Sequence, residues 1–288
     1  LQRTIGSQQV GAMLTTVDRP FLDRSARVFG IDHRWQPDPS LTVASTLVGS
    51  DVAVHGDHVR DVAFTTLLQK EMAGGWRQTG ILIHYGKDFE VNDAGYLGRA
   101  DLNYAQWEVG RRITDLPAAS AYASHNWRWR IEGLQNTGGT WLQRQFRMSR
   151  NSQRRDGGNL FWNVQARTAA YDDRITRGNG AMRTQAGFNG VVTREWPRRG
   201  DWQFETEWSL GLRGGVRSDT PVGWSGSFEA TRHFGDALNV EVWVGHVMDQ
   251  EFLVWQQDNL VSGFQMNRYD LSASLNWMPW WSARGLPK

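Results

Sequence analysis

The chain has 288 residues, enough for one large domain or two ordinary ones, and no cysteine, which excludes disulfide bridges, thiolate metal sites and a cysteine nucleophile. Its 32 lysines and arginines are scattered among 30 aspartates and glutamates, a distribution that argues against nucleic acid as a partner. No run approaches the roughly 18 to 20 apolar residues of a transmembrane helix, so any membrane crossing would use strands.

Alternation of apolar and polar residues is the main pattern along the chain. It is clearest at 202–213, where Trp208 and Leu210 share one face of a strand and Glu205 and Glu207 share the other. Most alternating segments are about ten residues long, close to the length with which a tilted strand crosses a bilayer core. In chain order, about fourteen strands are expected near 8–17, 26–35, 41–50, 61–70, 77–86, 101–113, 121–133, 140–150, 159–170, 183–193, 202–213, 222–233, 238–248 and 264–277.

The expected connections alternate in length. Short turns are expected at 37–40, 73–75 and 235–237, and longer loops at 51–60, 87–100, 171–182 and 249–263. A barrel with short turns at one rim and long loops at the other gives this pattern. No composition break marks a second domain, so 1–288 is expected to be one domain.

Sixteen tryptophans in a chain with a mean hydropathy of −0.55 must face a specific apolar environment. Most lie near the ends of expected strands and share a face with Leu, Val and Phe, which favours aromatic girdles at the level of lipid headgroups. The alternative is a platform on which sugar rings stack, in an all-β carbohydrate-binding or glycan-cleaving protein. The tryptophans concerned are Trp35, Trp76, Trp107, Trp141, Trp196, Trp202, Trp224, Trp277, Trp280 and Trp281.

The polar faces carry charges of both signs, which indicates either a lumen cross-linked by ion pairs or a weakly selective aqueous path. The simpler alternative is the solvated face of a soluble sheet. Glu205 and Glu207 have the spacing of a glycosidase pair, but any residues two apart on a strand have it, so no catalytic residue is assigned. The candidate lumen-lining residues are Asp32, Arg34, Glu108, Arg112, Arg128, Arg130, Glu132, Arg147, Arg167, Glu205, Glu207, Arg213, Glu229, Glu241 and Asp270.

Two expected loops, at 55–58 and 88–99, carry residues that could bind a metal or fold into a lumen. His55, Asp57 and His58 offer two imidazoles and a carboxylate to a metal, but a further ligand at a defined spacing is missing, so a solvated loop is favoured and neither a metal nor a cofactor is expected. The segment 88–99 combines Gly, aromatic and charged residues, and it is either a plug that folds into a lumen or an exposed loop.

Several stretches resemble a large bacterial family of unassigned function: IGSQQVGAM at 5–13, VDRP at 17–20, FGIDHRW at 29–35, FEVNDAGY at 89–96 through Asp101, and NLFWN at 159–163. Its members carry an N-terminal carbohydrate-binding-like sandwich followed by a long C-terminal outer-membrane barrel. The resemblance implies that this chain begins within the barrel part, as a fragment of a longer protein, and supplies no catalytic residues.

The sequence thus predicts an all-β fold, an antiparallel transmembrane β-barrel of about fourteen strands in the bacterial outer membrane. It would act as a porin-like channel or as a membrane anchor, without enzymatic activity. The expected partners are membrane lipids, and besides them glycans or another outer-membrane or periplasmic protein. The alternative is the all-β carbohydrate-binding or glycan-cleaving protein, and it differs in where the tryptophan faces point.

Overall fold

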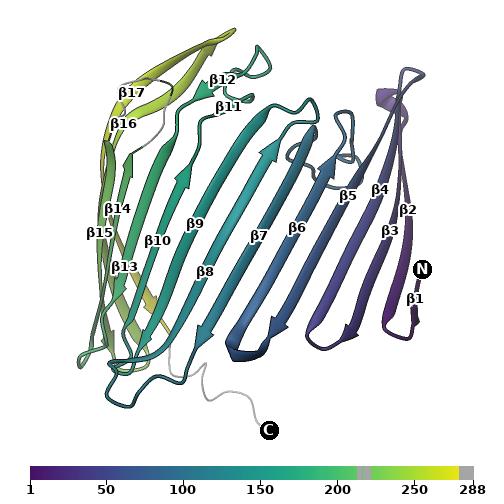
Figure 1. Cartoon of the computed structure of the whole chain (residues 1–288). Helices are drawn as coiled ribbons and strands as arrows, with labels where there is room; N and C mark the ends of the chain where they lie inside the picture. Colours follow the sequence, from purple (N-terminus) through teal and green to yellow (C-terminus); the bar gives the residue numbers. More distant parts are fainter. Residues whose placement is uncertain (213–215, 217–221, 279–288) are drawn as a thin grey trace. The chain divides into compact units, whose positions relative to one another are not determined.

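The computed structural model describes residues 1–212, 216 and 222–278, and almost all of its regular structure is strand (Figure 1). The only helical elements in these residues are two 3-10 turns, η1 (Pro20–Leu22) and η2 (Ala73–Gly75). No helix in the described part of the chain is long and apolar enough to span a membrane. The predicted all-β class is confirmed.

Fifteen strands of the described residues form one antiparallel sheet, in which neighbours in sequence are neighbours in space except that β10 pairs with β13. A separate two-stranded sheet is made by β11 (Ala170–Asp172) and β12 (Met182–Thr184). The strands of the large sheet are β1 (Gln2–Ile5), β2 (Gln8–Arg19), β3 (Arg24–Asp38), β4 (Leu41–Val54), β5 (Asp57–Met72), β6 (Trp76–Tyr85), β7 (Leu102–Ile113), β8 (Tyr122–Gln135), β9 (Trp141–Arg154), β10 (Asn159–Arg167), β13 (Gly187–Glu195), β14 (Trp202–Leu212), β15 (Val222–Phe234), β16 (Leu238–Gln257) and β17 (Leu260–Trp277).

All fourteen predicted strands have a counterpart, and the described residues form three more, β1, β11 and β12. The loops predicted at 51–60 and 249–263 are wrong, because β4, β5, β16 and β17 continue through those segments. These segments are strands because each reversal of the chain takes only two residues. His55 and Gly56 have φ of 51° and 86°, so two residues reverse the chain between β4 and β5, and Asp258 has φ of 46° at the tip of the β16–β17 hairpin.

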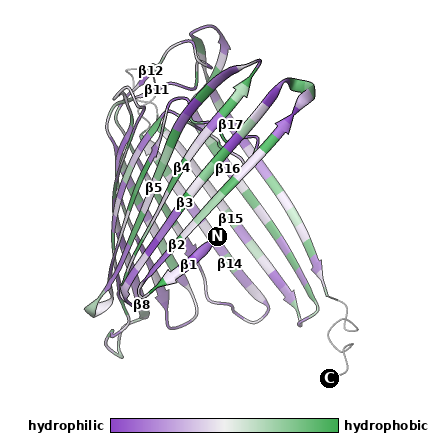
Figure 2. Ribbon diagram, turned by 90° about the vertical axis from the view of Figure 1, so that its right-hand side faces the viewer, coloured by the Kyte–Doolittle hydropathy of each residue, from purple (hydrophilic) through white to green (hydrophobic). Residues whose placement is uncertain are grey.

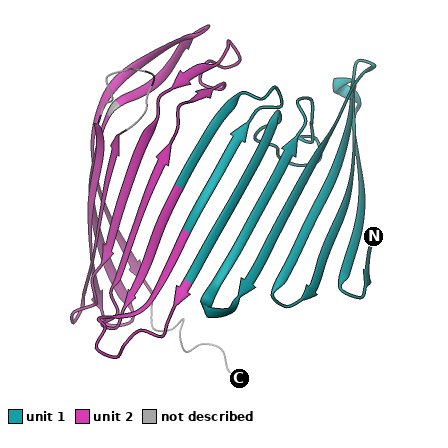
Figure 3. Cartoon of the chain, viewed as in Figure 1, with its two compact units in different colours: residues 1–111, 129–146 teal, residues 112–128, 147–288 magenta. Residues whose placement is uncertain are grey.

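Contacts divide the chain into two compact units (Figure 3). Unit 1 comprises residues 1–111 and 129–146, and unit 2 comprises residues 112–128 and 147–288. In each unit we call the strand ends joined by the short turns the turn end, for example at 39–40 in unit 1 and 235–237 in unit 2. The opposite ends, which hold the connections 86–101 and 168–186, are the loop end. That 1–288 is one domain stays a prediction.

Hydropathy alternates along the strands, so that each unit has two different faces (Figure 2). In unit 2, Trp208 and Leu210 on β14 are 58% and 52% exposed, while Glu205 and Glu207 point to the opposite face. In unit 1, Leu82 on β6 is 53% exposed. We call the face with the exposed apolar side chains the apolar face, and the opposite one the polar face. Large apolar side chains therefore stay exposed on the apolar face, whereas a soluble sheet buries such side chains.

Aromatic rings on the apolar face lie over glycines of neighbouring strands. The directly opposite pairs are Phe29 with Gly49, Trp107 with Gly80, and Trp208 with Gly226. A Cβ atom placed on Gly226 would lie 2.7 Å from a ring carbon of Trp208, so the ring occupies the place of a side chain. Each glycine lets an aromatic ring lie flat on the sheet.

We therefore expect Gly226→Ala to force the Trp208 ring off the sheet and to lower the free energy of unfolding by about 1 kcal/mol, the size of one cross-strand pair. The control is Gly190→Ala on the same face, because its nearest neighbour, a Phe188 ring carbon, would lie 3.7 Å from the new Cβ, an ordinary contact. Denaturant unfolding of both variants in the same detergent measures the difference. Equal stabilities would contradict this packing role.

Candidate functional site

The connection 86–101 between β6 and β7 lies across the polar face of unit 1. The backbone N–H of Asp88 donates to Oδ2 of Asp61 on β5 at 2.9 Å, and that of Glu90 donates to Oγ of Ser50 on β4 at 3.2 Å. These bonds carry the loop from β6 over two neighbouring strands. The loop is thus attached to the sheet by its backbone and not only by its ends.

The far side of the loop is fixed by a buried ion pair. The side chain of Asp93 is 5% exposed, and its carboxylate lies 2.6 Å from Nη2 of Arg24 and 3.2 Å from Nε of Arg19. Arg19 ends β2 and Arg24 begins β3. A buried carboxylate is stable only when its charge is compensated, so loss of both arginines would release this part of the loop.

Small apolar side chains fill the polar face between these anchors. Phe89 of the loop is 5% exposed and stacks on Tyr85, with 5.8 Å between ring centroids. The remaining buried hydrophobic residues of unit 1 lie on β3, β4 and β5, on the strands that the loop crosses, and are Ala26, Val28, Val52 and Ala63. Of the two interpretations of 88–99, the structure has a loop folded onto the polar face, with Tyr96 as an exposed exception.

The loop ends at Asp101, which joins it to the turn after β8. The carboxylate of Asp101 accepts the backbone N–H of Thr137 at 2.8 Å and also the hydroxyl of Thr137. Partial burial raises the pKa of Asp101, but the hydroxyl and amide of Thr137 lower it by more, so the pKa lies below its ordinary value. The charged form is the one that holds the two connections together.

A charged network on β7 and β8 occupies the polar face of unit 1 further along the strands. Nε and Nη2 of Arg130 donate to Oε2 of Glu108 at 3.0 and 2.6 Å, and Nη1 of Arg130 lies 3.8 Å from Oε2 of Glu132. The side chains of Glu108 and Glu132 are only 10% and 8% exposed. One guanidinium therefore serves two nearly buried carboxylates.

Neutral side chains complete this network. Glu132 accepts the hydroxyl of Tyr104 at 3.2 Å, an amide N–H of Gln143 at 2.9 Å, and an amide N–H of Gln145. Because the Glu132 carboxylate accepts donors from β7 and β9, it links β8 to both neighbouring strands. Tyr104, Gln143 and Gln145 were not among the predicted residues, since nothing in a single sequence marks neutral partners of this kind.

Unit 2 carries acidic residues in register on its polar face. Glu195 on β13, Glu205 on β14 and Glu229 on β15 lie directly opposite one another across the three strands. Glu207 accepts the hydroxyl of Thr193 at 3.1 Å. Like charges at opposite positions disfavour the sheet unless water or counter-ions screen them, so this surface suits contact with an aqueous, cation-containing medium.

The predicted lumen-lining residues that the structure describes all lie on the polar faces. That they line a lumen stays a prediction, and Arg213 lies outside the described residues. In unit 1 they are Asp32, whose carboxylate accepts the Thr46 hydroxyl at 2.7 Å, Arg34, Glu108, Arg130 and Glu132. In unit 2 they are Arg112, Arg128, Arg147, Arg167, Glu205, Glu207, Glu229, Glu241 and Asp270.

Most of the tryptophans predicted for the girdles lie at strand ends, with Trp107 as an exception midway along β7. At the turn ends lie Trp35, Trp76, Trp196, Trp202 and Trp277; Trp141 begins β9 and Trp224 lies near the start of β15, both at loop ends; and Trp280 and Trp281 lie outside the described residues.

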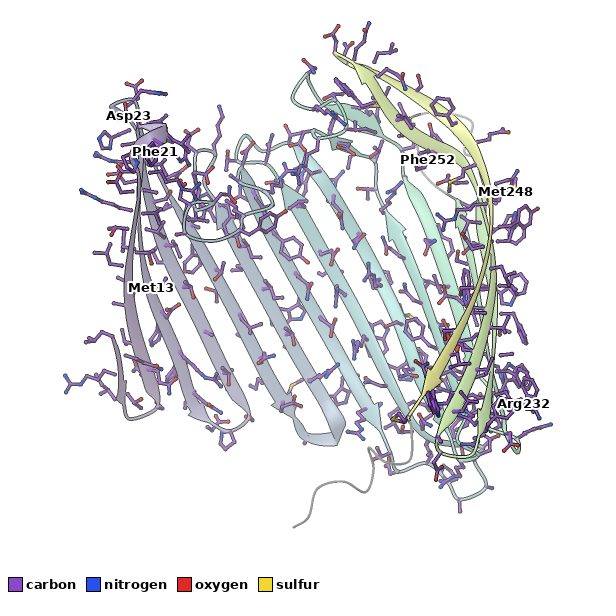
Figure 4. The ribbon with its side chains drawn as sticks, turned by 180° about the vertical axis from the view of Figure 1, so that it is seen from behind. Met13, Phe21, Asp23, Arg232, Met248 and Phe252 are labelled. Atoms are coloured by element: carbon purple, nitrogen blue, oxygen red, sulfur yellow. The ribbon has the colours of Figure 1, made fainter. Side chains whose placement is uncertain are left out.

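Arginines accompany several of the turn-end tryptophans. The guanidinium carbon of Arg232 lies 5.4 Å from the ring centroid of Trp202, and that of Arg194 lies 4.2 Å from the ring centroid of Trp196. Arg232 lies near the turn end of β15, whereas Met248 and Phe252 lie further along β16 (Figure 4). Rings and cations together are typical of the boundary between lipid and water.

The two histidines around the β4–β5 turn have local roles. Nδ1 of His58 lies 2.7 Å from the Asp51 carboxylate, and His55 occupies the two-residue turn. Within residues 1–212, 216 and 222–278, no group of three or more His, Cys, Asp or Glu side chains is arranged to hold a metal ion.

No family model and no curated protein matches the chain, so the resemblance stated from the sequence stays a prediction. Solved structures do match. An anion-selective porin from Comamonas acidovorans shares 8% identity and a TM-score of 0.46 over 94% of this chain and 99% of that one. OmpF from Salmonella typhi in complex with daunomycin shares 8% identity and a TM-score of 0.45 over 96% of this chain and 100% of that one.

The siderophore receptor PirA from Pseudomonas aeruginosa shares 12% identity and a TM-score of 0.49 over 86% of this chain. The chain spans 44% of the length of that receptor. The structural neighbours are thus porins and receptors of the outer-membrane β-barrel type. Similarity at this level identifies neither a family nor an activity for this chain.

The lowered pKa of Asp101 predicts a pH-dependent contribution to stability. Above the ordinary pKa of 3.8 the carboxylate is charged in folded and unfolded chains and its bonds to Thr137 stabilise the fold, and this contribution is lost as the pH falls through the lowered folded value. We expect Asp101→Asn to lower the stability by about 1 kcal/mol at pH 6, with the difference from the unsubstituted chain vanishing toward pH 2. Unfolding at several pH values measures it, and Asp236→Asn, in an exposed turn, is the control.

Proposed function

We propose that this chain forms a transmembrane β-barrel of the bacterial outer membrane and acts as a channel whose aqueous path runs along the polar faces. The observation that carries this proposal is the division of each unit into a face of exposed large apolar side chains and a face of ionic and amide groups. Soluble monomers rarely expose contiguous apolar patches above a few hundred Å². Lipid is the environment in which the apolar face is stable.

The arrangement on the apolar face of unit 2 supports a membrane position. One row across the sheet joins Thr206, Phe228, Val244 and Leu271, and the last three are 42%, 42% and 76% exposed. Toward the turn end, the apolar residues are followed by a row that contains an aromatic ring, Trp202, and a cation, Arg232. Strands of bacterial barrels carry such a band between aromatic girdles.

Closure of the sheet is part of the proposal. In the described residues β1 pairs only with β2 and β17 only with β16, so each leaves one edge of backbone N–H and C=O groups. Within lipid these groups have no water to bind, and an open edge is therefore excluded from the apolar core of a bilayer. A sheet that closes on itself satisfies them.

The polar faces favour a channel over a purely anchoring role. A passive anchor needs no charges on its inner surface, whereas here an arginine and two glutamates form a network in unit 1 and a row of glutamates crosses unit 2. The loop 86–101 would narrow the path on the side of unit 1, because it lies on the polar face. We infer a water-filled passage with a fixed constriction.

The carbohydrate-binding alternative requires tryptophan rings and carboxylates on one surface. On β14, Trp202 and Trp208 lie on the apolar face and Glu205 and Glu207 on the opposite one. Rings and acids therefore do not converge around a sugar there. A glycan, or another outer-membrane or periplasmic protein, remains a proposed partner of the water-exposed parts of the barrel.

The first test is heat-modifiability on a gel combined with membrane fractionation and planar-bilayer conductance. A compact species that shifts only on boiling, found in outer membranes and conducting ions, is the expected result. A compact species without conductance would favour the anchor. A soluble chain without a heat-dependent shift would overturn the barrel and support the carbohydrate-binding alternative.

A matched pair of substitutions tests which face meets lipid. Phe228 is on the apolar face in the middle row, so Phe228→Arg is expected to lower the stability in a bilayer by about 2–4 kcal/mol. Ser227→Arg places the same charge one residue away on the polar face, next to Glu207 across the strands, and is expected to be nearly neutral. Unfolding from vesicles measures both. Similar losses for the two variants would contradict the proposed orientation.

A further inference from the structure

Two arginines and an aspartate form a row on the apolar face of unit 1. Arg27 on β3 lies directly opposite Asp51 on β4, and Asp51 lies directly opposite Arg60 on β5. The row lies near the loop end, since Arg27 is the fourth residue of β3 and Arg60 the fourth of β5. One row nearer the loop end, the same face carries Asp18 on β2 and His58 on β5, in register with Ser25 and Ala53.

The row holds two arginines and one aspartate, and Asp18 lies in the adjacent row. Asp51 is engaged by Nε of Arg60 at 3.1 Å and by Nδ1 of His58 at 2.7 Å. No acidic partner of Arg27 is found among the described residues, and both arginines are exposed, Arg60 with 67% of its side chain. Arg60 is thus paired with Asp51 while Arg27 is not, and the remaining N–H groups of both arginines are open to a ligand.

The next row toward the turn end is apolar and hollowed. It consists, in register, of Leu14, Phe29, Gly49 and Val62, of which Leu14 is 70% exposed. Because Gly49 has no side chain, the ring of Phe29 lies down over it and the surface is low between Leu14 and Val62. A hollow of about 650 Å³ extends over this row and the charged row beside it.

The position of the two rows fits the boundary of a bilayer. The β2–β3 tip with Phe21 and Asp23 lies at the loop end, well beyond Met13 along β2 (Figure 4). At about 3.4 Å per residue, Arg27 lies roughly 10 Å along the strand from the start of β3. Below it, exposed apolar residues such as Ile31 and Leu47 continue the face. A molecule in the hollow would therefore have its polar part at the arginines and its apolar part on the row below.

We propose that this hollow binds an anionic lipid of the outer leaflet, with a headgroup phosphate on Arg27 and Arg60 and an acyl chain along Phe29, Gly49 and Val62. Guanidinium groups bind phosphate oxygens through paired N–H donors, and two of them lie at the edge of this hollow. Long loops of bacterial barrels face outward, which assigns the site to the outer leaflet. The proposal rests on the proposed function, because only a membrane position brings lipid to this face.

The test uses the full chain folded in detergent micelles and titrated with diphosphorylated lipid A, with dephosphorylated lipid A and inorganic phosphate as separate probes. The readout is the temperature at which the compact gel species converts to the unfolded one. The variants are Arg27→Gln/Arg60→Gln, which removes the cations, and Arg34→Gln, a control on the polar face of the same strand. Val62→Phe fills the hollow but keeps both arginines.

Diphosphorylated lipid A is expected to raise the conversion temperature of the unsubstituted chain and of Arg34→Gln. In Arg27→Gln/Arg60→Gln the lipid concentration for half of the shift should rise about tenfold or more, and it should rise in Val62→Phe as well. Inorganic phosphate alone should give no shift. An equal response of all variants, or an equal response to the dephosphorylated lipid, would overturn the site while leaving the barrel in place. Absence of any compact species would overturn the proposed function and the site with it.

Discussion

Side chains of a strand point alternately to its two sides, and this constraint organises the whole molecule. Residues such as Trp208 and Glu205 cannot share a face, however the sheet is curved or closed. A chain that alternates over strands of nine to twenty residues therefore makes one surface suited to lipid and another suited to water. The other contacts belong to one face or the other. Aromatic rings over glycines and arginines beside tryptophans lie on the apolar face, and the ion-pair network of β7 and β8 lies on the polar face.

The buried interior of unit 1 is small and lies between the sheet and the loop 86–101. It is held by stacking of Phe89, by backbone bonds to β4 and β5, and by compensation of one buried carboxylate, Asp93, with Arg19 and Arg24. These contacts have different chemistry but the same effect, because each keeps the loop on the polar face. In a barrel the main contact area is with lipid, so a fixed loop of this kind supplies much of the internal packing.

The strands were predictable because alternation is a local property. The two-residue turn at His55 and Gly56 was not, since a polar stretch with glycine suits a loop as well as a tight turn. Partners on the polar face depend on register: Asp93 and Arg24 are 69 residues apart, and no spacing rule connects them. Trp107 was predicted for the girdle near a strand end, whereas it lies midway along β7 opposite Gly80, a partner that follows from how the two strands pair.

The length of β16 has a consequence for the outside of the molecule. Its 20 residues are about twice the number that crosses a bilayer core, so the hairpin with β17 would rise well above the membrane at the loop end. At the tip of this hairpin Asp258 has a positive φ, which allows the chain to reverse. In the proposed orientation this tip would lie outside the cell, where an inserted peptide tag would be displayed without disturbing the sheet.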